Sequence, residues 1–351
     1  MSQNSRRAGK VLLVAAVILI VVFLLLLPPT QDLLRRYLVD PFSPHYPEEV
    51  RMEIERTVVL DANGGHITEY VIDLPVPQGI HEDGAWLQKV SDLEVSPLFS
   101  QYWDNGSYET LVWEGQDLYG ELTVRVTLTA TQRLHRWDLD QGTVLGRDEV
   151  PQPLLDLYLD DEWKIIVDHP DIQQLSEDIV GDEDNVFLIA QAIYGWIDDN
   201  LDYYIWSDDE PLSSLDTLDR GKGDCDDQSI LFCALARAAG VPAWLQLGAV
   251  YDRSNENMGG HAWVQMFMPT EDGGTNVTID LVNDNFLVWM PNLFCEYTDT
   301  GLPGDLYDAY HSVRVSYFGA TPSVTASYEV LGYEESEEKV TLSLMALRED
   351  L

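Results

Sequence analysis

Residues 221–227 read Gly221-Lys-Gly-Asp-Cys225-Asp-Asp227 and stand before a helical pattern that runs to Ala239. Asp224 is of a type that caps helix N-termini, and Gly240 followed by Val241-Pro242 is a signal that ends a helix. We therefore expect Cys225 in the first turn of a helix. Unpaired N–H groups and the helix dipole favour a thiolate there, whereas the neighbouring acids oppose it.

A histidine and a carboxylate follow in strand-like segments. His261 stands in Gly259-Gly260-His261-Ala262-Trp263, where the glycines allow close backbone approach, and Asp280 stands in Thr278-Ile279-Asp280-Leu281. A thiolate attacks a carbonyl, an imidazole carries the proton, and a carboxylate orients the ring. Cys225, His261 and Asp280 are therefore the predicted catalytic residues. A buried structural cysteine is the alternative for Cys225, and Asp284 competes with Asp280.

No metal or other cofactor is predicted. A zinc site at Cys225, His261 and an acid would lack the paired spacing of CxxC or HExxH motifs. Asp138, Asp140 and Gly142 are similar to part of a calcium loop, but the fifth-position ligand and the sixth-position glycine are missing.

The chain has three cysteines, and an odd number leaves at least one free thiol. A bridge between Cys233 and Cys295 would leave Cys225 free. We favour the alternative that Cys233 and Cys295 are buried free thiols, because three cysteines form no disulfide framework.

The net charge of the chain is strongly negative. It has 61 acidic and 20 basic residues, which give a formal charge of −41 at pH 7. This charge repels phosphate backbones, so we predict no nucleic-acid partner. The acids are spread along the sequence, as in a protein kept soluble in high salt or in an ordinary acidic secreted protein.

An apolar segment near the N-terminus predicts a single-pass membrane anchor. Residues 11–27 are all apolar and would form a helix of about 26 Å, close to the thickness of a hydrocarbon core. Pro28-Pro29 ends the segment, which lacks the small residues of a signal-peptide cleavage site. Because more positive charge precedes it than follows it, residues 1–10 are expected in the cytoplasm and the rest of the chain outside.

The next two segments are a linker and a β-rich domain. Prolines interrupt residues 28–48, which predicts a linker. Residues 49–150 contain alternating stretches such as Val50–Val58 and Leu122–Ala130, with Asn-Gly turns between them. This pattern predicts an all-β sandwich of antiparallel strands.

The chain then becomes mixed. Residues 151–300 combine helical patterns, such as 183–198, with the strand-like segments of His261 and Asp280. We predict an α+β domain in which the nucleophile helix packs on an antiparallel sheet. Residues 301–351 contain further alternating segments and form a β-rich extension.

Several stretches together resemble the transglutaminase-like cysteine hydrolase superfamily, in its microbial branch with a β-rich domain before the core. They are Leu215–Asp227, Ala234–Ala243, Gly260–Trp263, Ile279-Asp280 and, upstream, Ile193–Tyr203. The resemblance covers residues 150–295 and implies a papain-like core. It implies Cys225 as nucleophile, His261 as general base and acid, and Asp280 as the residue that orients His261.

The expected activity is that of a membrane-anchored extracytoplasmic cysteine hydrolase, which cleaves peptide or isopeptide amides of a protein or peptide substrate through a thioester. Transamidation or deamidation by the same residues, and a non-catalytic surface protein that keeps the fold, are the alternatives. Trp206, Tyr203 and Tyr204 are candidates for the oxyanion donor by position only. Trp206 and Trp263 are candidate substrate-binding residues, although Trp263 also suits a packed core.

Overall fold

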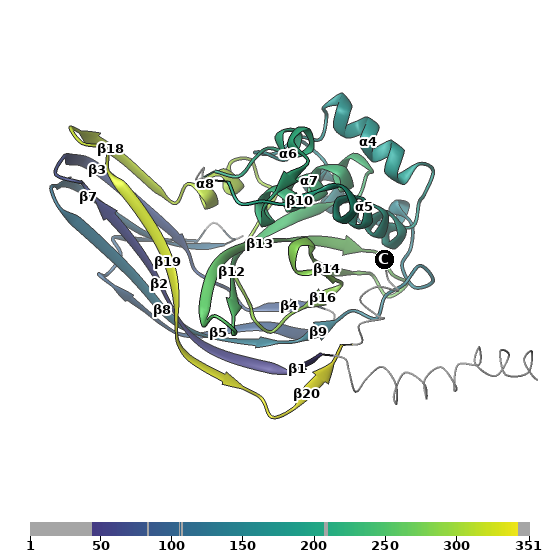
Figure 1. The fold of residues 1–351 in the computed structure, drawn as a ribbon, viewed down its shortest axis with the longest axis horizontal. Helices are drawn as coiled ribbons and strands as arrows, with labels where there is room; N and C mark the ends of the chain where they lie inside the picture. The colour runs from purple at the N-terminus through teal and green to yellow at the C-terminus, as the bar shows by residue number, and fades with distance from the viewer. Residues whose placement is uncertain (1–43, 83, 105, 107, 207–209, 343–351) are drawn as a thin grey trace, which may run out of the picture. The chain divides into compact units, whose positions relative to one another are not determined.

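The computed structural model describes residues 44–342, apart from residues 83, 105, 107 and 207–209 (Figure 1). The chain divides into two compact units, the larger of which is Pro47–Lys339. The smaller unit includes residues 44–46 and 340–342 of the described chain. Strands β1 (His45–Pro47) and β20 (Lys339–Thr341) form a two-stranded sheet. No helix among the described residues is long and apolar enough to cross a membrane, and the predicted anchor at 11–27 lies outside them.

The larger unit is a mixed α/β structure with antiparallel sheets, and its β-rich part contains two of them. One has the order β18-β3-β7-β6 and the other β19-β2-β8-β5-β4. The strands are β2 (Glu49–Asp61), β3 (His66–Pro75), β4 (Ile80–Glu82), β5 (Ala85–Ser96), β6 (Gln101–Asp104), β7 (Glu109–Leu118), β8 (Glu121–Arg133), β18 (Val313–Phe318) and β19 (Ser323–Glu335). Strands from the C-terminal part of the chain therefore extend both sheets.

An apolar core fills the space between these two sheets. It is built from Val58, Leu60, Ala62, Ile67, Ile72, Leu74, Leu111, Trp113, Val124 and Val126. In β2 and β8 the apolar side chains alternate with polar ones, as predicted, because successive side chains of a strand point to opposite faces. The pairing of β2 with β8 runs from Glu49 opposite Arg133 to Asp61 opposite Glu121.

The other part of the larger unit holds helices and a five-stranded sheet of order β15-β14-β13-β12-β17. Its strands are β12 (Ala243–Asp252), β13 (Asn257–Met268), β14 (Thr275–Asp280), β15 (Asn285–Phe286) and β17 (Leu293–Thr298). Its helices are α3 (Gln152–Tyr158), α4 (Pro170–Val180), α5 (Val186–Asn200), α6 (Ser214–Arg220), α7 (Cys225–Ala238) and α8 (Asp305–Tyr310), with 3-10 turns η3 (Arg147–Glu149) and η4 (Leu281–Asn283).

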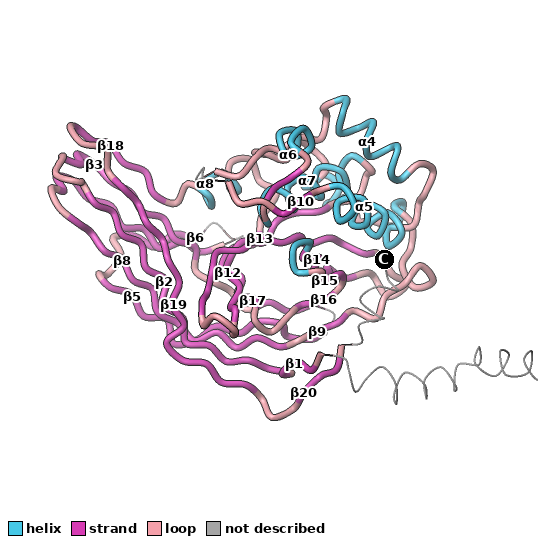
Figure 2. Tube along the Cα trace, in the orientation of Figure 1, coloured by secondary structure: helices cyan, strands magenta, loops and turns pink. Residues whose placement is uncertain are grey.

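Helix α7 lies against β12 and β13, and the neighbouring helices surround it (Figure 2). The predicted apolar face of the 183–198 pattern is buried in α5, including Phe187, Ile193 and Ile197. Two short ladders complete this part. Strands β10 (Asp202–Tyr203) and β11 (Lys222–Gly223) are parallel, and β9 (His135–Arg136) pairs with β16 (Val288–Trp289).

A second apolar cluster joins the β-rich part to the five-stranded sheet. At the ends of β2 and β8 that are distant from the first core, apolar side chains pack against β12, β13 and β17. The cluster consists of Val50, Met52 and Ile54 of β2, Leu128 and Ala130 of β8, and Ala249, Tyr251, Met258 and Phe294 of the five-stranded sheet. Polar contacts reinforce this junction. The buried Gln88 amide exchanges hydrogen bonds with the backbone of Cys295, at 2.8 and 2.9 Å, and Arg56 pairs with Glu296 at 2.5 Å.

Candidate active site

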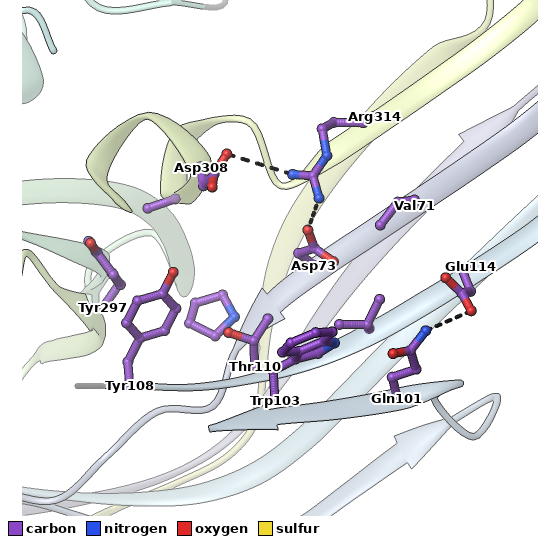
Figure 3. A pocket seen from close by; sticks show the side chains of 13 residues that line it. Val71, Asp73, Gln101, Trp103, Tyr108, Thr110, Glu114, Tyr297, Asp308 and Arg314 are labelled. Atoms are coloured by element: carbon purple, nitrogen blue, oxygen red, sulfur yellow. Dashed lines mark hydrogen bonds and ion pairs between the residues drawn. The ribbon is translucent and has the colours of Figure 1, made fainter. Parts of the chain in front are cut away.

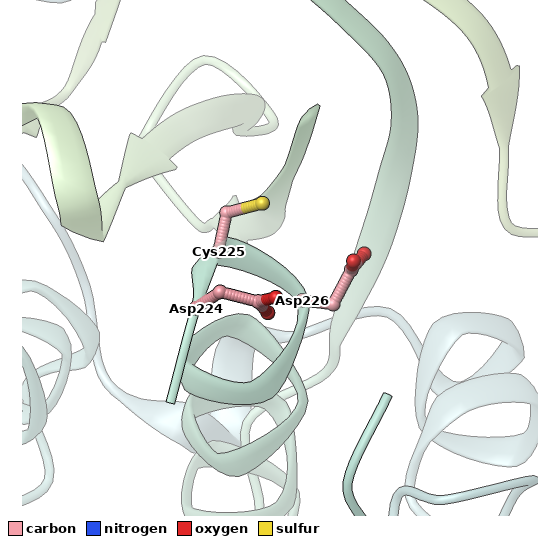
Figure 4. Close-up of side chains that lie close together, drawn as sticks. All are labelled: Asp224, Cys225 and Asp226. Carbon is pink, nitrogen blue, oxygen red and sulfur yellow. The ribbon is translucent and has the colours of Figure 1, made fainter. Parts of the chain in front are cut away.

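Helix α7 begins at Cys225 because Asp224 and Asp227 cap it. Figure 4 shows Asp224 and Asp226 on either side of Cys225 in the first turn. The Asp224 carboxylate accepts the backbone N–H of Asp227, and the Asp227 carboxylate accepts that of Asp224 at 3.2 Å. This reciprocal capping box satisfies donors that the first turn would otherwise leave unpaired. Asp227 also accepts the backbone N–H of Leu212 at 2.6 Å. The predicted cap at Asp224 is therefore confirmed.

The surroundings of Cys225 favour the neutral thiol. Its pKa is raised well above the ordinary value, first by burial and next by the negative charge of Asp226. A hydrogen bond from the backbone of Ala262, the residue after His261, acts in the opposite direction. Burial and the acids therefore outweigh the stabilisation that the helix N-terminus gives a thiolate, and Cys225 needs a base to lose its proton.

Asp226 is the acid that most affects the thiol. Its carboxylate accepts a hydrogen bond from the Tyr310 hydroxyl at 2.5 Å, so helix α8 contributes to the nucleophile's surroundings. The pKa of Asp226 is raised to about 6. Burial is the main cause, and the charges of Asp224 and Asp227 act in the same direction, whereas Tyr310 and His261 lower the pKa. Tyr310 was not identified from the sequence, because nothing in its local pattern connects residue 310 with residue 226.

His261 and Asp280 meet on adjacent strands. Strand β13 pairs with β14, with Val264 opposite Ile279, and this register brings the two side chains together. Nε2 of His261 lies 2.9 Å from Oδ2 of Asp280, and both side chains are almost fully buried. An ionised carboxylate only accepts hydrogen bonds, so Nε2 carries the proton and Nδ1 remains free to act as a base.

Asn283 is a further member of this group that sequence reasoning missed. Its Nδ2 donates to Oδ2 of Asp280 at 2.9 Å and lies 3.1 Å from Nε2 of His261. Turn η4 places Asn283 one turn after Asp280, and an amide three residues beyond the carboxylate is the signal that could have revealed it. Asp284, the competing acid of the sequence interpretation, instead ends η4 in the left-handed conformation, with φ of 54°.

Trp263 supports His261 from within the core. It is 0% exposed, its ring centroid is 5.6 Å from that of His261, and its Nε1 donates to Oε1 of Gln246 at 2.8 Å. On its other side it contacts Trp289 in an edge-to-face arrangement. Trp263 thus occupies the packed-core position that was the alternative to lining the substrate channel.

Close backbone approach occurs at a different glycine from the predicted pair. A Cβ added to Gly259 or Gly260 would meet nothing within 4 Å. The tight position is Gly248, which lies opposite His261 in the β12–β13 ladder, where an added Cβ would clash with the carbonyl oxygen of Phe294. The expectation for Gly259 and Gly260 was wrong, because the packing of β17 on β12 sets the constraint.

The aromatic residues upstream of the nucleophile occupy two different places. Tyr203 ends β10, which pairs with β11 just before Asp224. Burial raises the pKa of Tyr203, and so does the charge of the Cys225 thiolate, so the phenol lies within electrostatic reach of the nucleophile. Trp206 instead packs against Tyr204, with the two rings tilted by 58°, and the cations of Lys222 and Arg220 lie over its ring.

Among the described residues, one group of potential metal ligands was found, at Asp224, Cys225 and Asp226, whose ligand atoms lie within 4.8 Å of one another. Both carboxylates of this group have protein partners, in the helix cap and at Tyr310. In the rejected calcium loop, Oδ1 of Asp140 accepts the backbone N–H of Gly142 at 2.8 Å, which makes it a hydrogen-bonded turn.

All three cysteines are free thiols. Cys233 and Cys295 are buried, as the preferred interpretation predicted, and burial raises the pKa of Cys295 to about 12. Burial also raises the pKa of Cys233. Neither thiol is therefore activated as a nucleophile.

A hollow of about 360 Å³ on the β-rich part offers a contrasting environment (Figure 3). Trp103 is 60% exposed in it, and Arg314 forms ion pairs with Asp73 and with Asp308, the latter at 3.9 Å. Among the described residues that line this hollow there is no cysteine or histidine. Cys225 and His261 lie elsewhere, on α7 and β13.

Comparisons with known proteins agree with this location. Residues 173–280, which include Cys225, His261 and Asp280, match the transglutaminase-like superfamily. The search of curated proteins found no match. A solved structure of a candidate cysteine protease from Cytophaga hutchinsonii is similar in fold, with 17% identity and a TM-score of 0.56 over 84% of this chain and 95% of that one.

The chain also aligns with the periplasmic domain of TgpA from Pseudomonas aeruginosa, at 12% identity and a TM-score of 0.32, over 66% of this chain and 88% of that one. This alignment is too weak to support an argument. The match of residues 173–280 and the arrangement of helix α7 and strands β13 and β14 lead to one assignment. Residues 173–280 form a domain of the transglutaminase-like superfamily.

Proposed function

We propose that this protein is a membrane-anchored extracytoplasmic cysteine hydrolase that cleaves peptide or isopeptide amides. Cys225 is the nucleophile, His261 the general base and acid, and Asp280 the residue that orients His261. The observation that carries the proposal is the buried contact of 2.9 Å between His261 Nε2 and Asp280 Oδ2, beside the capped first turn of α7. The apolar segment at residues 11–27 supports the anchor.

In the proposed reaction, the Cys225 thiol gives its proton to Nδ1 of His261 as Sγ bonds to the amide carbon. The carbon–nitrogen bond then breaks, and the amine leaves with that proton. Water attacks the resulting thioester, and His261 takes a proton from it and returns the proton to sulfur as the carbon–sulfur bond breaks. Asp280 stabilises the imidazolium that forms twice in this cycle.

Tyr203 is the favoured side chain for donating a hydrogen bond to the developing oxyanion, since the β10–β11 ladder places it opposite Gly223, two residues before Cys225. Trp206 is bound to Tyr204, Lys222 and Arg220, so we assign it to the rim of the site, where it can contact substrate.

The proposal is tested by the reactivity of Cys225 in the full chain. We expect iodoacetamide to label Cys225 with a rate that falls sharply in His261→Ala, with the sites located by mass spectrometry. Cys233 and Cys295 serve as internal controls for buried, inactive thiols. Slow labelling of Cys225 that does not depend on His261 would contradict catalysis and favour a non-catalytic surface protein.

Product analysis then separates the reactions. A peptide mixture digested in water enriched in oxygen-18 should gain one labelled carboxyl oxygen per new C-terminus. Loss of the general base in His261→Ala should slow this about 10²–10⁴-fold. Incorporation of an added primary amine in place of the labelled oxygen would show transamidation instead.

A further inference from the structure

A polar pocket of about 230 Å³ lies beside the proposed catalytic residues. Four elements form its walls, namely α5, β10, α7 and the turn η4. The lining residues are Tyr194, Ile197, Asp198, Leu201, Tyr203, Gln228, Leu281, Val282 and Asp284. Pockets for whole small ligands usually measure about 300–1,000 Å³, so this one is of a size for a single side chain.

The pocket adjoins the nucleophile from three directions. Gln228 stands one helical turn after Cys225 and donates to the backbone carbonyl of Gly223 at 3.1 Å. Tyr203 lies opposite Gly223, two residues before Cys225, in the β10–β11 ladder. Leu281 directly follows Asp280 in the chain. A side chain held in the pocket would therefore belong to a residue close to the bond that Cys225 attacks.

The lining is acidic and rich in oxygen atoms. It contains the carboxylates of Asp198 and Asp284 and the hydroxyl of Tyr194, and none of the described residues that line it is a lysine, arginine or histidine. Tyr194 is 1% exposed, yet its hydroxyl has no hydrogen-bond partner among the described residues. A buried polar group without a partner is costly, so a donor is expected to enter the pocket and bind it. The two carboxylates favour a cationic donor.

We propose that this pocket binds the primary ammonium of a lysine-type side chain that flanks the cleaved amide; this inference rests on the proposed hydrolase function. An ammonium has three donors, which match the two carboxylates and the Tyr194 hydroxyl. The pocket stabilises the charged amine, which is not nucleophilic, so it recognises substrate and does not activate an acceptor amine. Among the described residues, the only group of potential metal ligands is at residues 224–226.

The test compares peptidyl chloromethyl ketones that alkylate Cys225 in the full chain and differ only in one side chain. Lysine is compared with norleucine, which has similar length without charge, and with arginine. We expect the lysine reagent to react about ten to a hundred times faster than the norleucine reagent, since hydrogen bonds to charged groups contribute about 1.5–3 kcal/mol. The lysine-to-norleucine ratio should fall towards one in Asp284→Asn and in Asp198→Asn.

A matched control is Asp199→Asn, which removes an exposed acid next to Asp198 that does not line the pocket. It should keep the wild-type ratio. If Cys225 reacts rapidly with iodoacetamide but the lysine and norleucine reagents react at equal rates, the pocket does not bind the ammonium. The hydrolase proposal would be unaffected by that result. A faster reaction of the arginine reagent than of the lysine reagent would show that the pocket binds a guanidinium and not an ammonium, and it would also contradict the inference.

If Cys225 is inert to iodoacetamide, the hydrolase proposal fails and the pocket is tested by binding alone. The probes are then Nα-acetyl-lysine methylamide and its norleucine analogue, titrated into the full chain carrying Cys225→Ala. Tighter binding of the lysine probe, lost in the added Asp284→Asn substitution, would support the pocket. Equal binding would overturn it.

Discussion

At the scale of single residues, the site places the proposed nucleophile, Cys225, among acids. Asp226 raises the pKa of Cys225, and the hydrogen bond from Tyr310 holds Asp226 in place. His261 must remove the proton of the Cys225 thiol although the negative charges of the neighbouring acids disfavour the thiolate. Burial raises the pKa of Asp226 to about 6, so its carboxyl group becomes negatively charged as the pH rises through about 6. This pH lies within the range in which cysteine enzymes work. Asp226 therefore tunes the pH at which Cys225 reacts.

Asp226→Asn should shift the pH profile of Cys225 alkylation to lower pH, because it removes a negative charge that opposes the thiolate. The side-chain amide oxygen introduced by this substitution can still accept the hydrogen bond from the Tyr310 hydroxyl. Alkylation rates between pH 5 and pH 9 measure the shift, and Asp219→Asn, an exposed acid on α6, is the control. A profile unchanged in Asp226→Asn would show that Asp226 does not act on the thiol.

The same substitution has a defined effect on stability. The folded-state pKa of Asp226 is raised from 3.8 to about 6, so its stability contribution is full below pH 3.8 and is lost as the pH rises through 6. Asp226→Asn removes that loss. Relative to wild type, the free energy of unfolding of the variant should therefore increase between about pH 4 and pH 6 and stay higher by a constant amount above that, as measured by urea denaturation.

At the scale of elements, the site depends on how closely β12 approaches its neighbours. Gly248 lies opposite His261 on one side and against Phe294 of β17 on the other, where the ladder shifts register. The absence of a side chain allows β17 to reach β12, and that packing fixes the strand from which His261 projects. A glycine in a strand often marks such an approach of two backbones.

Gly248→Ala should destabilise the protein by about 1–3 kcal/mol, the usual cost of overpacking a core. It should also slow Cys225 labelling, because β13 has to move with β12. Gly260→Ala is the control: its added Cβ meets nothing, so it should change the free energy of unfolding by less than about 0.5 kcal/mol. Urea denaturation measures both, and equal effects would refute the role of Gly248.

At the scale of the whole molecule, residues 47–339 share their cores. Strands β2 and β8 contribute one end to the core between the two sheets of the β-rich part and the other end to the cluster on β12, β13 and β17. The buried Gln88 amide links β5 to Cys295. We therefore expect the β-rich part and the catalytic part to unfold together, because neither can expose its share of these clusters independently.

Leu60→Ala tests this coupling, since Leu60 is fully buried between the two β-rich sheets and far along β2 from the second cluster. Truncation should cost about 2–5 kcal/mol. Cys233, in helix α7, reports on the catalytic part by its reactivity in urea. The urea midpoint for Cys233 exposure should fall with Leu60→Ala. A midpoint that stays at the wild-type value would show that the two parts unfold separately.

The sequence alone was sufficient for local features whose cause is local. The cap at Asp224, the end of helix α7 before Gly240 and the alternation in β2 and β8 all depend on residues near one another in the chain. The predicted anchor at 11–27 lies outside the described residues.

Tertiary structure decided the features that join distant residues. The Tyr310 hydroxyl donates a hydrogen bond to Asp226, and the Asn283 amide lies 3.1 Å from Nε2 of His261. Gly248 allows β17 to pack closely on β12, and the C-terminal strands β18 and β19 form edge strands of the two β-rich sheets. No local pattern encodes these contacts, because each depends on the pairing and packing of elements separated by tens to hundreds of residues. The acidic pocket beside the nucleophile has the same origin, since four separate elements must come together to form its walls.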